Sequence, residues 1–141
     1  MQELVKVHEL APGATECEVT FTVGLDTCNR VATDNQRGRL ISQKPLDSFL
    51  FDLKPTFAKL DVEGYEEEIL RGGKALLGKG SLQAIELETV TAPVVEMLSL
   101  HGFVRAFYEP FARHLSKEPI GGQPCNALFV KDFSFVTSRI Q

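Results

Sequence analysis

The chain has 141 residues, 43% of them hydrophobic and 24% charged, and its formal net charge is −4. This length fits one domain, and the composition is rich enough in apolar residues to bury a core, which excludes an intrinsically disordered chain. An acidic balance without basic runs argues against a nucleic-acid partner, and the apolar runs are too short for a membrane span. The first residues have no signal-peptide pattern, so we expect a cytoplasmic protein.

The first third of the chain predicts short strands and one long loop. Alternating apolar residues favour strands over 5–10 and 19–23, and the turn residues between them favour a hairpin. The polar stretch 24–39 is expected to be a loop, of a length that is often functional or mobile in a compact domain. A short strand over 39–42 and a helical turn over 45–50 follow.

The central stretch, 57–80, predicts a buried strand, a sharp turn and an amphipathic helix. The strand, 57–62, is mostly apolar, and Asp61 lies at its end. Gly64 suits a tight turn because glycine tolerates positive φ. Apolar residues then recur every three or four positions over 62–76, which predicts one buried helix face.

The remaining elements alternate between strands and helices. Further strands are predicted over 82–87, 103–108 and 127–130, a helix begins near Pro93, and 109–124 is irregular. This order predicts an α/β fold with a largely parallel sheet. The last two strands have no helix between them, so we expect them to be antiparallel neighbours at an edge.

Carboxylates stand where two predicted strands end. In open α/β sheets, ligands bind outside the carboxyl ends of the strands, which makes Asp61 a candidate site residue. The alternative is that Asp61 only caps the following helix. The strand 82–87 likewise runs into Glu86 and Glu88.

Cysteine and histidine offer no metal motif. The number of cysteines is odd and no pair has a CxxC spacing, which argues against a disulfide framework and a zinc site. His114 stands out among the scattered histidines because aromatic residues surround it. We therefore retain it as a substrate-binding candidate and expect no metal site.

Several motifs lie in a fixed order along the chain. They are Leu46-Asp47, the block KLDVEG at 59–64, Glu67 or Glu68 with Leu70 and Gly72, IELE at 85–88, Gly102-Phe103 and NALFV at 126–130. Together they resemble the signature of the FkbM-type methyltransferase family. The similarity covers nearly the whole chain and is most specific between 46 and 88.

The resemblance implies a class I, Rossmann-like methyltransferase sheet with flanking helices, mostly parallel with an antiparallel edge strand. It implies S-adenosyl-L-methionine as methyl donor and a hydroxyl acceptor on a sugar, a lipid-linked saccharide or another small molecule. It also places Asp61 and Glu63 at the end of the family's fourth strand and Glu88 at the end of the fifth.

Methyl transfer to a hydroxyl requires removal of its proton, which a positioned carboxylate can accept. Asp61 is the leading candidate for that base or for orienting the acceptor. Glu63 could share the role or simply stabilise the helix N-terminus. Glu88 could hold the acceptor or serve as a structural hydrogen-bond acceptor.

Acceptor contacts generally come from variable loops. The stretches 24–39 and 109–123 are the candidates here. Within or beside the second stretch, Tyr108 and His114 are predicted substrate-binding residues, because an aromatic ring can stack on a sugar or an apolar acceptor. The alternative for Tyr108 is ordinary packing.

One part of the family pattern has no counterpart. Members begin with a strand, a Gly-rich turn and a helix that hold the donor, and no such turn follows a predicted strand here. We therefore expect residues 1–141 to form a single domain, N-terminally truncated relative to the family, with an incomplete donor site. An exposed sheet flank would favour self-association or a partner chain.

Two alternatives to a methyltransferase remain at this point. The first is a non-catalytic binding or assembly module, or an inactive fragment, derived from the same fold. The second is a metal-dependent hydrolase that uses Asp61, Glu63 and Glu88 as oxygen ligands for Mg²⁺. No nucleophile motif accompanies these carboxylates, so the methyltransferase hypothesis explains the central block better.

Overall fold

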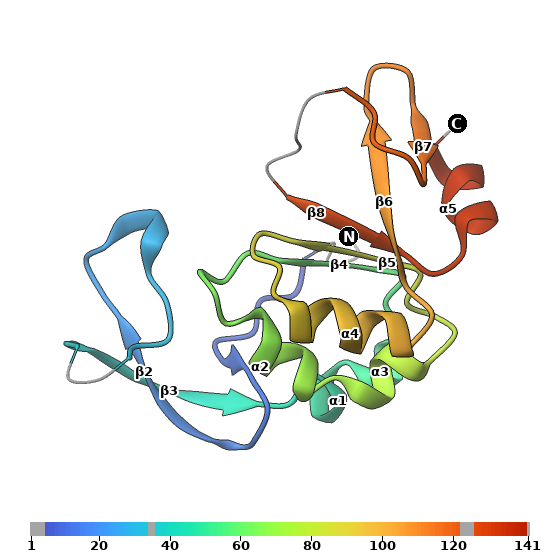
Figure 1. The fold of residues 1–141 in the computed structure, drawn as a ribbon. Helices are drawn as coiled ribbons and strands as arrows, with labels where there is room; N and C mark the ends of the chain where they lie inside the picture. Colours follow the sequence, from blue (N-terminus) through green and yellow to red (C-terminus); the bar gives the residue numbers. More distant parts are fainter. Residues whose placement is uncertain (1–4, 34–35, 122–125, 141) are drawn as a thin grey trace.

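The structure is a computed structural model that describes residues 5–33, 36–121 and 126–140 (Figure 1). The described elements form two β-sheets with helices packed against them. In chain order they are β1 (Ala11–Pro12), β2 (Cys17–Thr22), the 3₁₀ helix η1 (Asp26–Cys28), β3 (Gly38–Lys44), α1 (Leu46–Phe49), the 3₁₀ helix η2 (Phe51–Leu53), β4 (Phe57–Leu60), α2 (Glu66–Arg71), α3 (Lys74–Gly78), β5 (Ala84–Leu87), α4 (Ala92–Leu100), β6 (Val104–Glu109), β7 (His114–Ser116), β8 (Ala127–Val130) and α5 (Phe133–Ile140).

The larger sheet has the strand order β4-β5-β8-β6-β7. Only β4 and β5 form a parallel pair, whereas β8 is antiparallel to both of its neighbours and β7 is antiparallel to β6. The prediction of a largely parallel sheet is therefore wrong. β5 and β6 are both antiparallel to β8 and so share one direction, but β8 lies between them, which leaves β4–β5 as the one parallel pair among the described strands of this sheet.

The strands 103–108 and 127–130 are antiparallel neighbours, as predicted, but not at an edge. β8 lies in the interior of the sheet, between β5 and β6, and β7 forms the edge beyond them. The predicted irregular stretch 109–124 contains β7, which the sequence analysis missed. Residues 122–125, including Cys125, lie outside the described part of the chain.

Helices cover the two faces of this sheet unequally. One face packs against α1 to α4 and forms the main core, in which fully buried residues come from both layers. They include Ile69, Leu77, Leu98, Ile85, Leu87 and Phe129. The opposite face packs a smaller cluster around Ala84, Ala106 and Val130 against Phe133 and Val136 of α5. Figure 1 shows α5 beside β7 and the other helices below the sheet.

The predicted single helix after Gly64 is two short helices. It breaks at Gly72 and Gly73, where a Cβ on Gly72 would lie 1.9 Å from the carbonyl oxygen of Gly13. The second helix, α3, begins where the carboxylate of Asp47 accepts hydrogen bonds from the backbone N–H groups of Ala75 (2.9 Å) and Leu76 (2.7 Å). A side chain distant in sequence thus caps α3, which replaces the intrahelical partners that its first N–H groups lack.

The smaller sheet has the order β1-β3-β2, with β1 parallel and β2 antiparallel to β3. The predicted strand 39–42 is part of β3, which extends it in both directions. The predicted hairpin between 5–10 and 19–23 is wrong, because β2 pairs with β3 and residues 5–10 form no strand. Within the described ranges, no helix is long and apolar enough to cross a membrane.

Candidate functional site

Asp61 and Glu88 follow two adjacent parallel strands. Leu60 at the end of β4 pairs with Leu87 at the end of β5, and the backbone N–H of Glu88 donates to the carbonyl oxygen of Leu60 at 3.1 Å. The residues that come next in each strand therefore lie side by side at one edge of the sheet. This is the neighbourhood that the sequence analysis expected for these two carboxylates.

Glu63 joins them through a tight turn. Glu63 has φ of 53° and Gly64 has φ of 93°, and the N–H of Tyr65 donates back to the carbonyl oxygen of Val62 at 3.4 Å. Two consecutive positive φ angles are typical of a type I′ turn, in which glycine is favoured. A left-handed glutamate is uncommon, and here it directs the chain from β4 into α2.

The carboxylates differ in their pKa values. Lys59 donates to Asp61 at 2.8 Å, and this hydrogen bond and its positive charge lower the pKa of Asp61. The pKa of Glu88 is raised, first by partial desolvation and then by the negative charges of Glu63 and Asp61. A carboxylate with a raised pKa is the stronger proton acceptor, so the two groups are suited to different roles.

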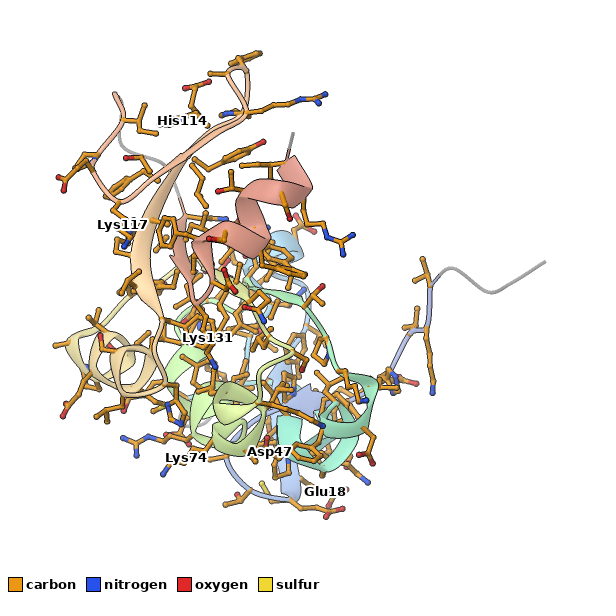
Figure 2. All side chains as sticks on the ribbon, turned by 90° about the vertical axis from the view of Figure 1, so that its right-hand side faces the viewer. Glu18, Asp47, Lys74, His114, Lys117 and Lys131 are labelled. Carbon is orange, nitrogen blue, oxygen red and sulfur yellow. The ribbon has the colours of Figure 1, made fainter. Side chains whose placement is uncertain are left out.

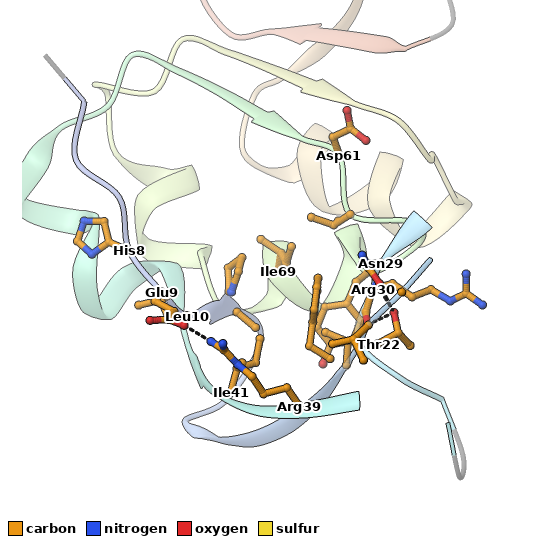
Figure 3. Close-up of a pocket in the computed structure, with 18 residues that line it drawn as sticks. His8, Glu9, Leu10, Thr22, Asn29, Arg30, Arg39, Ile41, Asp61 and Ile69 are labelled. Atoms are coloured by element: carbon orange, nitrogen blue, oxygen red, sulfur yellow. Dashed lines mark hydrogen bonds and ion pairs between the residues drawn. The ribbon is translucent and has the colours of Figure 1, made fainter. Parts of the chain in front are cut away.

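A cavity of about 600 Å³ opens beside Asp61, between the smaller sheet and the start of α2. Figure 3 shows Asp61 above this space, with Ile41 and Ile69 on its walls. Much of the lining is apolar, and it includes Leu10, Phe21, Val31, Ile41, Val62 and Ile69. Arg30 and Asn29 from the predicted functional loop 24–39 also line it.

Two hydrogen bonds connect Tyr65, at the start of α2, to the smaller sheet. The hydroxyl of Tyr65 donates to Oε1 of Gln43 at 2.8 Å, and Nε2 of Gln43 donates to the carbonyl oxygen of Thr15 at 2.9 Å. Gln43 is only 3% exposed, and burial also raises the pKa of Tyr65. These hydrogen bonds hold β3 against the turn that carries the carboxylates.

Several residues of the signature have structural roles. Leu46 is buried in the core and Asp47 caps α3, as described above. Glu66, 2% exposed, accepts a hydrogen bond from the N–H of Thr89 and so ties α2 to the segment after β5. Glu86 of β5 accepts a hydrogen bond from Nδ2 of Asn126 at 2.7 Å.

Tyr108 and His114 lie elsewhere. They belong to β6 and β7, and the strand order places β6 three strand spacings from β4, about 14 Å. His114 is exposed near the tip of the β6–β7 hairpin (Figure 2). Neither residue lines the cavity beside Asp61, so their predicted contact with a substrate finds no support in this site.

The sequence analysis missed two parts of the site. It did not assign a role to Lys59, although alternation along the strand places it beside the position of Asp61. It also missed the cavity walls contributed by residues 8–12, which precede β2 by several positions. In the part of the chain that the structure describes, no group of three or more His, Cys, Asp or Glu residues is arranged to hold a metal ion.

The fold and the carboxylate cluster define a mixed α/β domain with a candidate site at the ends of two adjacent parallel strands. A family model, the methyltransferase FkbM domain, matches residues 9–116. The match includes the smaller sheet, β4 to β7 and the whole carboxylate cluster, and the chain belongs to this family. No curated protein and no solved structure matches the chain.

Proposed function

We propose that the chain carries the catalytic site of an S-adenosylmethionine-dependent methyltransferase, which transfers a methyl group to a hydroxyl oxygen of a small molecule. The observation that carries this proposal is the cluster of Asp61, Glu63 and Glu88 at the ends of adjacent strands, beside a cavity of about 600 Å³. Membership of the FkbM methyltransferase family supplies the reaction class.

Of the three carboxylates only Asp61 lines the cavity, but Glu88 lies beside the end of β4 and is the better candidate for the base on its pKa. Its pKa is raised, whereas Lys59 lowers the pKa of Asp61 and makes that carboxylate a weak proton acceptor. In the proposed step, the acceptor hydroxyl gives its proton to Glu88 while its oxygen bonds to the methyl carbon and the carbon–sulfur bond of the donor breaks. Asp61, held by Lys59, orients the hydroxyl. This assignment differs from the sequence analysis, which favoured Asp61.

The described residues fit one end of the methyl donor. Three carboxylates attract its sulfonium charge and can accept hydrogen bonds from its hydroxyl groups. The other end carries a carboxylate, which needs backbone N–H groups or a cation. The N-terminus of α2 cannot meet that need, because Glu66, Glu67 and Glu68 occupy its first turn. Arg30 and Arg39 line the cavity and can pair with that carboxylate, but no Gly-rich turn follows a described strand, so we propose that another polypeptide segment completes the donor site.

The cavity favours one kind of acceptor. Most of its lining surface is apolar, from aliphatic side chains and Phe21, and polar side chains supply the smaller part. A saccharide needs many hydrogen-bonding groups, because each buried hydroxyl must be paired. The lining therefore favours a hydroxyl attached to an apolar body over a free sugar.

Binding and transfer experiments test the proposal together. We would titrate the protein calorimetrically with S-adenosylhomocysteine and measure transfer of labelled methyl groups to a panel of apolar and saccharide alcohols. Loss of a general base typically reduces the rate by about 10²- to 10⁴-fold, so Glu88→Gln should do so, with a smaller loss for Asp61→Asn. Glu96→Gln, an exposed change on α4, is the matched control.

Two results would contradict the proposal. Folded protein that neither binds S-adenosylhomocysteine nor transfers methyl groups, alone or with added cell extract, would favour the non-catalytic module. Equal activities of Glu88→Gln and Glu96→Gln would remove Glu88 from the base role.

A further inference from the structure

β4 has an open side. On the other side, the carbonyl oxygens of Thr56 and Leu60 point toward β5. They accept hydrogen bonds from the backbone N–H groups of Gln83, Ala84 and Glu88. In a parallel ladder, alternate residues bond to opposite sides, so the N–H and C=O groups of Phe57 and Lys59 point away from β5. β4 is terminal in the strand order, and among the described residues no strand pairs with this side.

The core behind this edge is incompletely filled. A second cavity, of about 220 Å³, lies beneath β4 and is lined almost entirely by apolar residues, among them Leu46, Ala58, Leu60 and Ile85. Phe57, on the edge itself, is 52% exposed. Open strand edges with apolar surroundings are sites at which another strand pairs.

Residues 5–7 have a strand-like sequence and no strand partner, so they could fill an open edge of this kind. Val5-Lys6-Val7 alternates apolar and charged residues, as a strand does, yet it pairs with no strand in the described structure. Val5 is 70% exposed and Val7 85% exposed. Figure 2 shows this segment, which we call the N-terminal arm, leaving the body of the molecule.

The base of the arm is fixed to the body of the molecule. The ring of His8 packs at 5.8 Å from the ring of Phe49, and Glu9 forms an ion pair with Arg39. In this arrangement residues 5–7 form no described backbone hydrogen bond with β4 of the same chain. Pairing with β4 of a second copy leaves both contacts in place.

We propose that two copies of this chain associate by arm exchange, each adding residues 5–7 as a strand to the open edge of β4 in the other. Val5 and Val7 would then lie on one face of the sheet, over Ala58 and Leu60, and close the 220 Å³ cavity. Lys6 would lie on the other face, which carries Lys59 on β4 and Glu86 on β5. Because each copy offers one arm and one edge, the exchange closes with twofold symmetry.

The oligomeric state tests this directly. We would measure the molar mass of the full chain by light scattering across a concentration series and compare Val7→Asp with Phe111→Asp. Both replace an exposed apolar side chain, and Phe111, 99% exposed in the β6–β7 connection, lies far from β4. We expect a dimer whose dissociation constant rises at least tenfold in Val7→Asp and is unchanged in Phe111→Asp.

Hydrogen exchange identifies the surface involved. The amides of Phe57 and Lys59 should be protected at concentrations that favour the dimer, and Val7→Asp should abolish that protection. A monomer at all concentrations would overturn the proposal, and so would a dimer that Val7→Asp leaves intact. Protected Phe57 and Lys59 amides in a monomer would show that the arm folds onto its own edge, which also refutes exchange.

Discussion

Asp47 supports the start of α3 from a helix that lies 28 residues earlier in the sequence. Its carboxylate accepts hydrogen bonds from the backbone N–H groups of Ala75 and Leu76, and the hydrogen bond from Leu76 is partly buried. Replacing a capping side chain by alanine costs about 0.5–2 kcal/mol, and a hydrogen bond to a charged group contributes about 1.5–3 kcal/mol. Once the carboxylate of Asp47 is removed, water can accept a hydrogen bond from the N–H of Ala75, but it reaches the N–H of Leu76 less easily. We therefore expect Asp47→Ala to lower the free energy of unfolding by about 2 kcal/mol.

Urea unfolding followed by circular dichroism measures this loss. For a chain of this size, about 2 kcal/mol corresponds to a fall in Tm of about 4–8 °C. Asp47→Asn keeps one acceptor oxygen and should lose about half as much. Asp52→Ala, an exposed aspartate of η2, is the control and should stay within about 0.5 kcal/mol of the original chain. The reasoning is refuted if Asp47→Ala is no less stable than this control.

Three further predictions concern the contacts around the site. Gly72→Ala should lower the free energy of unfolding by at least about 1–3 kcal/mol, because its Cβ would meet the backbone of Gly13, whereas Gly80→Ala has open space and should cost little; equal urea midpoints would contradict this. Tyr65→Phe should lose about 1–2 kcal/mol by leaving buried Gln43 without its donor, and Tyr108→Phe, partly exposed, is its control in the same assay. Lys59→Gln should raise the pKa of Asp61 in a carboxyl NMR titration. Because the folded-state pKa of Asp61 is lowered, the ion pair contributes stability at neutral pH that is lost as the pH falls through that pKa, and this loss should shrink in Lys59→Gln; an unchanged titration would exclude the pair as the cause.

Sequence patterns predicted the features of the fold that depend on residues close together in the sequence. The strand 127–130 was predicted with its observed bounds, because an uninterrupted apolar run of four residues fits a buried strand. The proximity of Asp61 and Glu88 also followed from the sequence, since both come directly after apolar strands that a helix connects.

Long-range contacts set the features that the sequence did not reveal. The break at Gly72 depends on Gly13 and Asp47, and no pattern near Gly72 distinguishes a break from a continuous helix. The direction of β8 depends on where the chain returns after β7. The cavity beside Asp61 has one wall from residues around 8–12 and 21–41, so it arises only once the smaller sheet has packed against α2.

The two sheets share no hydrogen-bonded strand pair among the described elements. Besides the connecting chain, the contacts between them include the Tyr65–Gln43 hydrogen bond and the close approach of Gly13 to Gly72. The 600 Å³ cavity lies at this junction, because its lining comes partly from the smaller sheet and partly from the turn and helix after β4. A shift of the smaller sheet relative to α2 would therefore change the shape of the cavity without breaking a strand pair in either sheet. The Tyr65–Gln43 hydrogen bond opposes such a shift.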